Sequence, residues 1–96
     1  VVLTVLTPPS TPRVTVVIPA YNRSQALRPT VDSVLTQTFA DWELLVVDDG
    51  STDDTGEVVR SYADPRIRYL RQANSGHSAA RNLGLQHARG ELLAFL

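Results

Sequence analysis

Two adjacent aspartates, Asp48 and Asp49, follow an apolar run and precede Gly50 and Ser51. Paired carboxylates at the end of a buried strand are costly unless something there needs negative charge or donates hydrogen bonds to them. Successive strand side chains point in opposite directions, so we expect the two acids to differ in role. One can hold backbone donors of the loop, while the other accepts from a base N–H or a ribose hydroxyl. Gly50 permits the positive φ of a tight turn, and Ser51 suits the cap of a following helix.

A second group, Pro19, Ala20, Tyr21 and Asn22, follows another apolar run. An aromatic ring at the end of a strand can stack on a flat base, and an asparagine offers both a donor and an acceptor. These residue types therefore suit the binding of a nucleotide base. Taken without their context, they are better explained as a turn whose Tyr21 covers the edge of the core.

Asn74, Gly76 and Arg81 form a third group at the start of an expected helix. A glycine lets the backbone approach a ligand near a helix N-terminus, which is a natural location for phosphate. One turn into the helix, a guanidinium can pair with a diphosphate through two parallel hydrogen bonds. The alternative is a structural ion pair between Arg81 and Asp48 or Asp49, and the sequence leaves both interpretations open.

Composition and missing motifs argue against several other functions. The formal net charge of -1 provides no excess of basic residues to neutralise nucleic-acid phosphates. The chain has no cysteine, hence no disulfide, thiolate metal site or cysteine nucleophile. His77 and His87 are spaced too widely for a helical metal-binding pair. Neither G-x-G-x-x-G after the first strand nor G-x-x-x-x-G-K-[ST] is present, so dinucleotide dehydrogenases and P-loop proteins drop out.

Strands and helices alternate along the chain, and they must position these three groups. Continuous β-branched runs predict strands covered on both faces, as in a parallel sheet, and apolar residues at helical spacing predict amphipathic helices between them. The expected strands cover residues 14–18, 42–47, 67–70 and 91–96, and the expected helices cover 29–37, 51–62 and 77–88. This order predicts an α/β protein with a Rossmann-like, doubly wound, mostly parallel sheet in three layers. Ligands of such sheets bind beyond the carboxyl ends of the strands.

Proline and glycine set several of the expected boundaries. Pro29 lacks the backbone donor that a second helical turn needs, so we expect it to be the first residue of its helix. Gly90 is expected to end the last helix as the glycine after the C-cap. Residues 1–12 are rich in proline and are expected to be a linker or a loose strand ahead of a domain over 13–96. Arginines flank residues 67–70, which places that strand near a sheet edge.

Together these motifs resemble the family 2 glycosyltransferases, a large inverting family with the nucleotide-diphospho-sugar transferase (GT-A) fold. The resemblance covers about residues 13–96, and it is carried by segments 14–22 (VTVVIPAYN), 33–39 (SVLTQTF), 42–53 (WELLVVDDGSTD), 74–76 (NSG), 80–84 (ARNLG) and 90–96 (GELLAFL). It implies that Ala20 and Tyr21 flank the uracil or other base. It also implies that Asp49 accepts from the base, that Asp48 supports the loop, and that Arg81 lies near the base or the diphosphate.

The resemblance further implies a transferase that moves a hexose from a nucleotide-diphospho-sugar, foremost a UDP-sugar, to a hydroxyl of a carbohydrate or lipid-linked acceptor, with inversion. In this family the fourth strand leads into an Asp-x-Asp motif that holds a divalent metal, Mg²⁺ or Mn²⁺, on the diphosphate. We expect that motif, the catalytic base and the acceptor site after Leu96. Residues 1–96 are then the nucleotide-binding half, with no metal ligand or catalytic residue of their own, and inactive alone.

Two further expectations concern alternatives and partners. A non-catalytic nucleotide-binding or receiver-like α/β module also places acids at a strand end, but receivers rely on a lysine on a later strand, and this chain has none. The free edge of the fourth strand can pair with residues 1–6 or with a second copy, which predicts a homodimer as one alternative. The lack of cysteine is compatible with a cytoplasmic protein, and association with the inner face of the membrane is an alternative for the full-length chain.

Overall fold

The structure is a computed structural model that describes residues 12–96. Strands and helices alternate along this range as β1 (Val14–Ala20), α1 (Ser24–Leu35), β2 (Trp42–Asp48), α2 (Thr55–Arg60), β3 (Ile67–Arg71), α3 (His77–His87) and β4 (Leu92–Phe95). A linker or loose strand was expected over residues 1–12. All of these residues except Pro12 lie outside the described range. None of the helices within residues 12–96 has the length and apolar character needed to cross a membrane.

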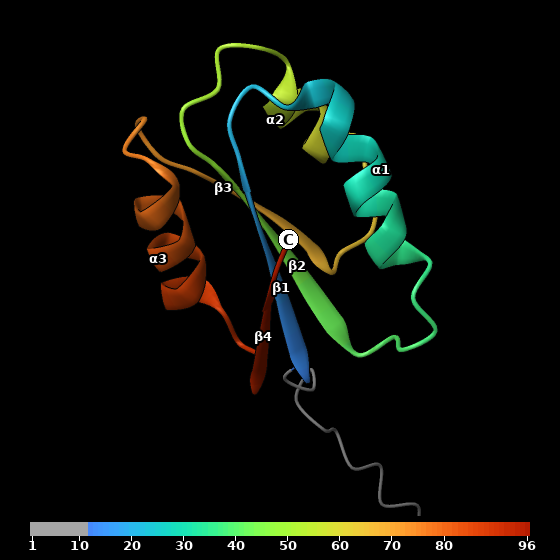
Figure 1. The fold of residues 1–96 in the computed structure, drawn as a ribbon. Coiled ribbons are helices and arrows are strands. Elements are labelled where there is room, and N and C mark those ends of the chain that lie inside the picture. Colours follow the sequence, from blue (N-terminus) through green and yellow to red (C-terminus); the bar gives the residue numbers. More distant parts are fainter. Residues whose placement is uncertain (1–11) are drawn as a thin grey trace, which may run out of the picture.

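All four strands belong to one parallel sheet with the order β3-β2-β1-β4. The chain adds strands from β1 outward to β3 and then returns to the other side of β1, so the order reverses at β1. Figure 1 shows α1 and α2 on one face of the sheet and α3 on the other. The three-layer α/β prediction is confirmed, and β3 lies at a sheet edge as expected. The carboxyl ends of the strands share one edge, and the reversal marks the crevice between β1 and β4 as the place for a ligand.

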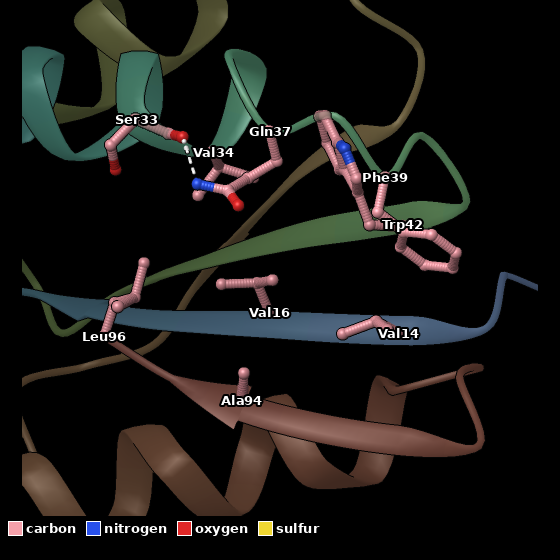
Figure 2. A pocket seen from close by; sticks show the side chains of 9 residues that line it. All are labelled: Val14, Val16, Ser33, Val34, Gln37, Phe39, Trp42, Ala94 and Leu96. Carbon is pink, nitrogen blue, oxygen red and sulfur yellow. Dashed lines mark hydrogen bonds between the residues drawn. The ribbon is translucent and has the colours of Figure 1, made fainter.

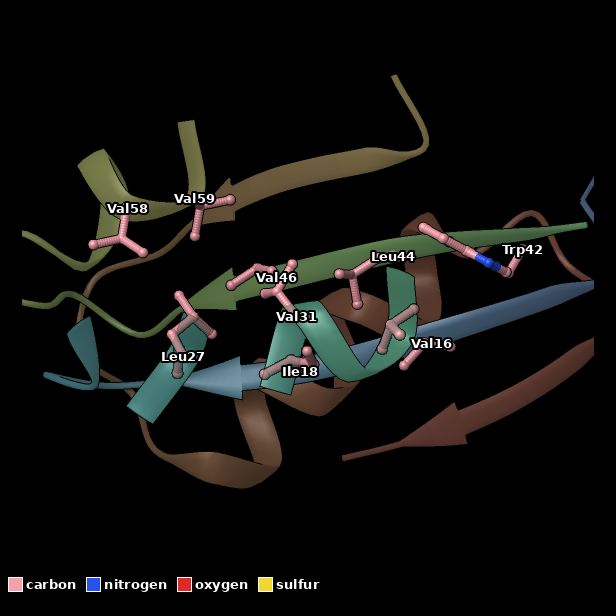
Figure 3. Close-up of a cluster of buried hydrophobic side chains, with 11 residues drawn as sticks. Val16, Ile18, Leu27, Val31, Trp42, Leu44, Val46, Val58 and Val59 are labelled. Atoms are coloured by element: carbon pink, nitrogen blue, oxygen red, sulfur yellow. The ribbon is translucent and has the colours of Figure 1, made fainter. Parts of the chain in front are cut away.

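The larger core lies between the sheet and the pair α1 and α2. One face of α1 buries three apolar residues at helical spacing, Leu27, Val31 and Val34. Their neighbours in the core come from β1, β2 and α2, as Figure 3 shows. On the opposite face α3 packs through Ala80 against Val17 and Val47. Both central strands are thus covered on both sides, which is why their sequences are apolar without alternation.

Helix α1 begins at Ser24, and the expected start at Pro29 is wrong. The first turn finds its hydrogen-bond partners in the segment that follows β2. Ser24 N–H donates to Asp53 Oδ2 at 3.3 Å, and Arg23 N–H donates to Thr55 Oγ1 at 3.1 Å. These acceptors are distant in sequence, so the local residues do not reveal how the first turn is satisfied.

Pro29 is an exposed residue inside α1 and leaves the carbonyl of Gln25 without its helical donor. We expect Pro29→Ala to raise the free energy of unfolding by about 1–2 kcal/mol. A proline inside a helix costs about 3 kcal/mol relative to alanine. Alanine also makes the unfolded chain more flexible, which offsets about 1 kcal/mol of the gain in stability. Urea denaturation measures the difference. Gln25→Ala, an exposed neighbour, is the control and should change stability by less than about 0.5 kcal/mol; an unchanged or lower stability of Pro29→Ala contradicts the prediction.

Two other helix boundaries differ from expectation. Helix α2 is shorter at both ends than the expected 51–62, and no side chain caps its N-terminus at the Asp54 position. Helix α3 ends at His87, and Ala88 is already extended, so the expected role of Gly90 as a glycine after the C-cap is wrong. Gly90 instead donates its N–H to Thr15 Oγ1 at 2.9 Å, where the chain turns into β4.

Pro19 lies within β1 rather than after it. Alternate residues of a strand direct their backbone groups to opposite neighbours, and the Val17 carbonyl accepts from Leu96 N–H on the β4 side at 3.0 Å. Pro19 therefore also faces the β4 side, beyond the last register pair, Val17 with Phe95. Its missing N–H leaves the pairing of β1 with β2 intact.

Strand β4 is the least covered strand of the sheet. Its side chains are apolar on both faces, yet Leu92 is 53% exposed and Phe95 is 44% exposed. Within residues 12–96 it pairs with β1 alone. The position of β4 therefore depends on that ladder and on the contacts at its ends.

Candidate functional site

Three loops meet at the carboxyl edge of the sheet: residues 21–23 after β1, 49–54 after β2 and 72–76 after β3. The first two are joined where Asp49 N–H donates to the Ala20 carbonyl at 2.8 Å. The third is joined to the second where Gln72 N–H donates to the Asp48 carbonyl at 2.9 Å. The structure thus brings loops from all three groups of expected ligand-binding residues to one edge.

The Asp49 carboxylate lies where the second and third loops meet and is only 7% exposed. Its Oδ1 accepts from Gln72 Nε2 at 2.8 Å and from Ser75 N–H at 2.7 Å. Its Oδ2 accepts from Gly76 N–H at 3.0 Å. These bonds, that from Gln72 foremost, hold the pKa of Asp49 below its usual value although burial opposes them. Asp49 is therefore ionised at neutral pH. A carboxylate offers about four acceptor positions, so about one remains, on Oδ2.

Asp48 is fully buried and holds the loop after β2 in place through hydrogen bonds. Its Oδ1 accepts from Ser51 N–H at 2.8 Å, and its Oδ2 accepts from the Tyr69 hydroxyl and from Arg71 Nη1. Arg71 also donates to the Ser51 carbonyl at 3.0 Å. Burial, followed by the bond to Asp48, raises the pKa of Tyr69, so the phenol stays protonated and continues to donate.

Gly50 allows the second and third loops to touch. It has φ of +76°, and a Cβ there would lie 2.7 Å from the backbone nitrogen of Asn74. The position requires glycine both for its left-handed backbone and for this close approach. Gly76 has φ of +99°, but the space around it is open. Asn74, whose backbone lies against Gly50 and which precedes Gly76 by two residues, is exposed.

Asn22 ties the first loop to the second. Its Oδ1 accepts from Thr52 N–H at 2.8 Å and from Asp53 N–H at 3.3 Å. Its own N–H donates to Ser51 Oγ at 2.9 Å, and its φ of +49° is a left-handed conformation that asparagine tolerates. The side-chain oxygens of Asn22 and Ser51 are thus engaged by the protein. Tyr21, next to them in the chain, is 45% exposed.

Arg81 makes no ion pair within residues 12–96, because the carboxylate of Asp48 is paired with Arg71 instead, at 3.2 Å. The alternative of an ion pair between Arg81 and either aspartate is therefore wrong. The Arg81 guanidinium lies 5.7 Å from the centre of the Phe95 ring, and the side chain is exposed, so it is available to an anionic ligand. Sequence reasoning missed Arg71, whose only signal is its place directly after the expected third strand.

The last two expected site residues belong to β1. Ala20 is 2% exposed and packs in the larger core, and Pro19 is half-buried. They offer a ligand their backbone and little side-chain surface. No three Asp, Glu or His side chains gather as a metal site within the described part of the chain.

An apolar groove of about 300 Å³ lies between α1 and the β1–β4 pair. Figure 2 shows its lining, which comes from β1, α1, the segment between α1 and β2, the start of β2, and β4 with the residue after it: Val14, Val16, Ser33, Val34, Gln37, Phe39, Trp42, Ala94 and Leu96. No charged side chain lines it. It therefore offers nothing to a diphosphate, and the carboxyl edge remains the candidate site.

Known proteins are similar to this chain in sequence and in fold. A family model described as Glycosyl transferase family 2 matches residues 15–96. The chain is 44% identical over 86 residues to the glycosyltransferase GlyA of Streptococcus pneumoniae, covering 88% of this chain and 12% of that protein. It is 42% identical over 84 residues to the UDP-Glc:alpha-D-GlcNAc-diphosphoundecaprenol beta-1,3-glucosyltransferase WfgD of Escherichia coli, covering 86% of this chain and 33% of that protein.

Two solved structures also resemble this chain in fold and in sequence. The mannosyltransferase PcManGT from Pyrobaculum calidifontis, in complex with GDP-Man and Mn²⁺, matches with a TM-score of 0.80 and 33% identity over 90% of this chain and 27% of that one. TarS 1-349 of S. aureus, in complex with UDP, matches with a TM-score of 0.83 and 31% identity over 88% of this chain and 26% of that one. The chain spans 12% of GlyA and 33% of WfgD. Motifs, sheet order and relatives lead to one conclusion: the chain belongs to glycosyl transferase family 2 and has the α/β fold of the GT-A enzymes.

Proposed function

We propose that the whole protein transfers a hexose from a nucleotide-diphospho-sugar to a hydroxyl of a carbohydrate or lipid-linked acceptor, with inversion, and that residues 12–96 bind the nucleotide. The observation that carries the proposal is the Asp49 carboxylate, held ionised where two loops meet with an acceptor position to spare. Family membership supports the sugar transfer. Membership of this family gives no support to the alternative of a receiver-like module.

Each part of the nucleotide has a complementary group at this edge. The exposed ring of Tyr21 stacks on the base, and Asp49 Oδ2 accepts from a base N–H. The Arg81 guanidinium, which has no carboxylate partner within residues 12–96, pairs with the diphosphate. Gly76, with open space around it, lets the N-terminus of α3 approach the phosphates.

The remaining acceptor position of Asp49 favours uracil over guanine as the base. Uracil presents a single ring N–H, whereas guanine presents two adjacent donors, which pair best with both oxygens of one carboxylate. Both oxygens of Asp49 already accept from the β3–α3 loop. One hydrogen bond to Oδ2 satisfies the ring N–H of uracil. Guanine can place both of its donors on the carboxylate only if it displaces the Gly76 N–H. The donor is therefore a UDP-sugar. The PcManGT structure contains GDP-Man and that of TarS contains UDP, so proteins with a similar fold bind both bases.

A divalent cation, Mg²⁺ or Mn²⁺, neutralises the charge of the departing diphosphate when bound. The two acids of this edge do not fit it, because protein donors already occupy the oxygens of Asp48 and most acceptor positions of Asp49. Within residues 12–96, no three Asp, Glu or His side chains gather as a metal site. The proposal therefore gives the described residues one task, which is to bind and orient the nucleotide, and gives them no part in holding the metal.

Titration of the 96-residue chain with UDP and with GDP, followed by NMR, tests the proposal. UDP should bind at least about tenfold more tightly than GDP, the value of about one hydrogen bond. The shifted signals should be those of Tyr21, Ser75 and Gly76. No sugar transfer is expected from this chain alone, with or without Mn²⁺. Tighter binding of GDP contradicts the base assignment, and the absence of shifts with both nucleotides contradicts the site.

A further inference from the structure

Glu43 is a buried acid at the amino end of the sheet, opposite the edge that carries Asp49, and the proposed function does not use it. It is 4% exposed. Its Oε2 accepts from the Thr15 hydroxyl and from Arg89 N–H, both at 2.7 Å, and its Oε1 accepts from Arg68 Nη1 at 2.9 Å. A carboxylate this buried is costly unless it is well bonded. Here its three donors come from three separate segments of the chain.

Glu43 is charged despite its burial. Burial by itself raises the pKa of Glu43, but the hydrogen bonds from Arg89 N–H, the Thr15 hydroxyl and Arg68 outweigh it, so the pKa lies below its usual value. A neutral glutamine in its place offers one acceptor oxygen and an NH₂ group. That NH₂ group has to face one of the donors that now bind the carboxylate.

The contacts of Glu43 continue to the end of α3 and the start of β4. Thr15 Oγ1 accepts from Gly90 N–H at 2.9 Å, and Arg68 Nη1 donates to the carbonyl of His87, the last residue of α3, at 3.0 Å. We call this set the Glu43 belt, and it consists of the side chains of Glu43, Thr15 and Arg68 with the backbone of His87, Arg89 and Gly90. It runs from β3 across β2 and β1 to the turn before β4.

Within residues 12–96, strand β4 depends on such a belt more than the other strands do. Its side chains are exposed, so the apolar packing that fixes β1 and β2 contributes little to its position. The turn before it lies directly against β1, since a Cβ on Gly90 would come within 2.6 Å of the Thr15 nitrogen. The polar contacts at this turn are therefore the part of the structure best placed to fix the register of β4.

We propose that Glu43 is the positioning residue of β4: through Thr15 and the backbone of Arg89 and Gly90, it sets the register at which β4 pairs with β1. Because β4 runs parallel to β1 toward the carboxyl edge, this register decides which residues arrive beside Tyr21. The inference concerns the sheet alone and stands or falls independently of nucleotide binding.

Amide hydrogen exchange in Glu43→Gln tests the proposal. We expect at least about tenfold faster exchange at the directly bonded amides of Arg89 and Gly90. The same increase is expected at Leu92, which donates to the Arg13 carbonyl just before β1, and at Leu96, which donates to the Val17 carbonyl; neither amide bonds to the belt. A purely stabilising residue would instead speed exchange throughout the sheet, so the reference amides are those of Leu44 and Asp49, which should change by less than about twofold. Glu57→Gln, an exposed acid on α2, is the matched control.

A second pair of variants keeps the test decisive if Glu43→Gln does not fold. Thr15→Val removes the hydroxyl that links Glu43 to Gly90 and should reproduce the fast exchange at Leu92 and Leu96. Thr15→Ser keeps the hydroxyl and should retain wild-type exchange there. Loss of protection confined to Arg89 and Gly90, equal loss at the reference amides, or failure of Thr15→Ser to preserve β4 overturns the proposal.

Discussion

Gly50→Ala is expected to lower the free energy of unfolding by about 2–5 kcal/mol. Part of this, about 1–2 kcal/mol, is the strain of an alanine in the left-handed conformation that Gly50 adopts with φ of +76°. The rest is steric, because the new Cβ would lie 2.7 Å from the backbone nitrogen of Asn74, which cannot rotate away as a side chain can. Relief of that clash has to move the β3–α3 loop away from Asp49. Nucleotide binding should therefore be lost together with stability.

Gly76→Ala separates the two contributions. Gly76 also has a positive φ, +99°, but a Cβ there meets nothing within 4 Å. This variant should cost only the backbone strain of its φ of +99° and ψ of +169°, about 1–3 kcal/mol. Urea denaturation of the wild type and both variants gives the comparison. Equal losses for the two glycines would show that the contact with Asn74 has no weight.

Asp49→Asn should have the largest effect on the proposed nucleotide site. The substitution keeps the shape of the side chain but turns one of its acceptors into an NH₂ group, which then faces a backbone donor at Ser75 or Gly76. The β3–α3 loop loses its anchor, and the base loses the acceptor that we assign to it. We expect UDP affinity to fall by at least about tenfold, measured by the same NMR titration. Asp54→Asn changes an exposed acid at the other end of the same loop, and this variant should bind UDP as the wild type does.

The pH dependence of stability offers a second measurement on Asp49. Its pKa is lowered on folding, first by the bond from Gln72 and then by that from Ser75 N–H. A lowered pKa means that its contribution to stability is complete above the pKa of the unfolded chain and is lost as the pH falls through the pKa of the folded protein. The wild type should therefore lose stability in this acid range more steeply than Asp49→Asn does. Parallel acid curves for the two proteins would contradict this assignment.

The ends of the strands could be predicted from the sequence to within about two residues. Strand β2 was expected at 42–47 and covers Trp42–Asp48. A strand covered on both faces is apolar at most positions, with Glu43 an exception within β2, so the length of the apolar run gives the approximate length of the strand. The carboxyl-edge location of Asp49 and Tyr21 follows from the same reasoning, because both residues come directly after such runs.

Contacts between distant segments could not be predicted in this way. The start of α1 depends on Asp53 and Thr55, which satisfy its first donors from across the sheet edge. The partner of Asp48 depends on the register of β2 with β3, which sets it opposite Arg71. For Glu43 the sequence contains a signal, an acid within an otherwise apolar run, but it does not reveal the donors that bind it.

Pro19 has a consequence for the shape of the carboxyl edge. A residue with an N–H at this position would donate to the carbonyl of Leu96, in continuation of the bond between Leu96 N–H and the Val17 carbonyl. The imino acid has no hydrogen to give, and its ring fills the place, so the ladder between β1 and β4 stops there. This position lies directly before Ala20 and Tyr21 in the chain. At the edge where we propose that the base binds, the main chain thus lacks one donor, and this holds whichever side chains surround it.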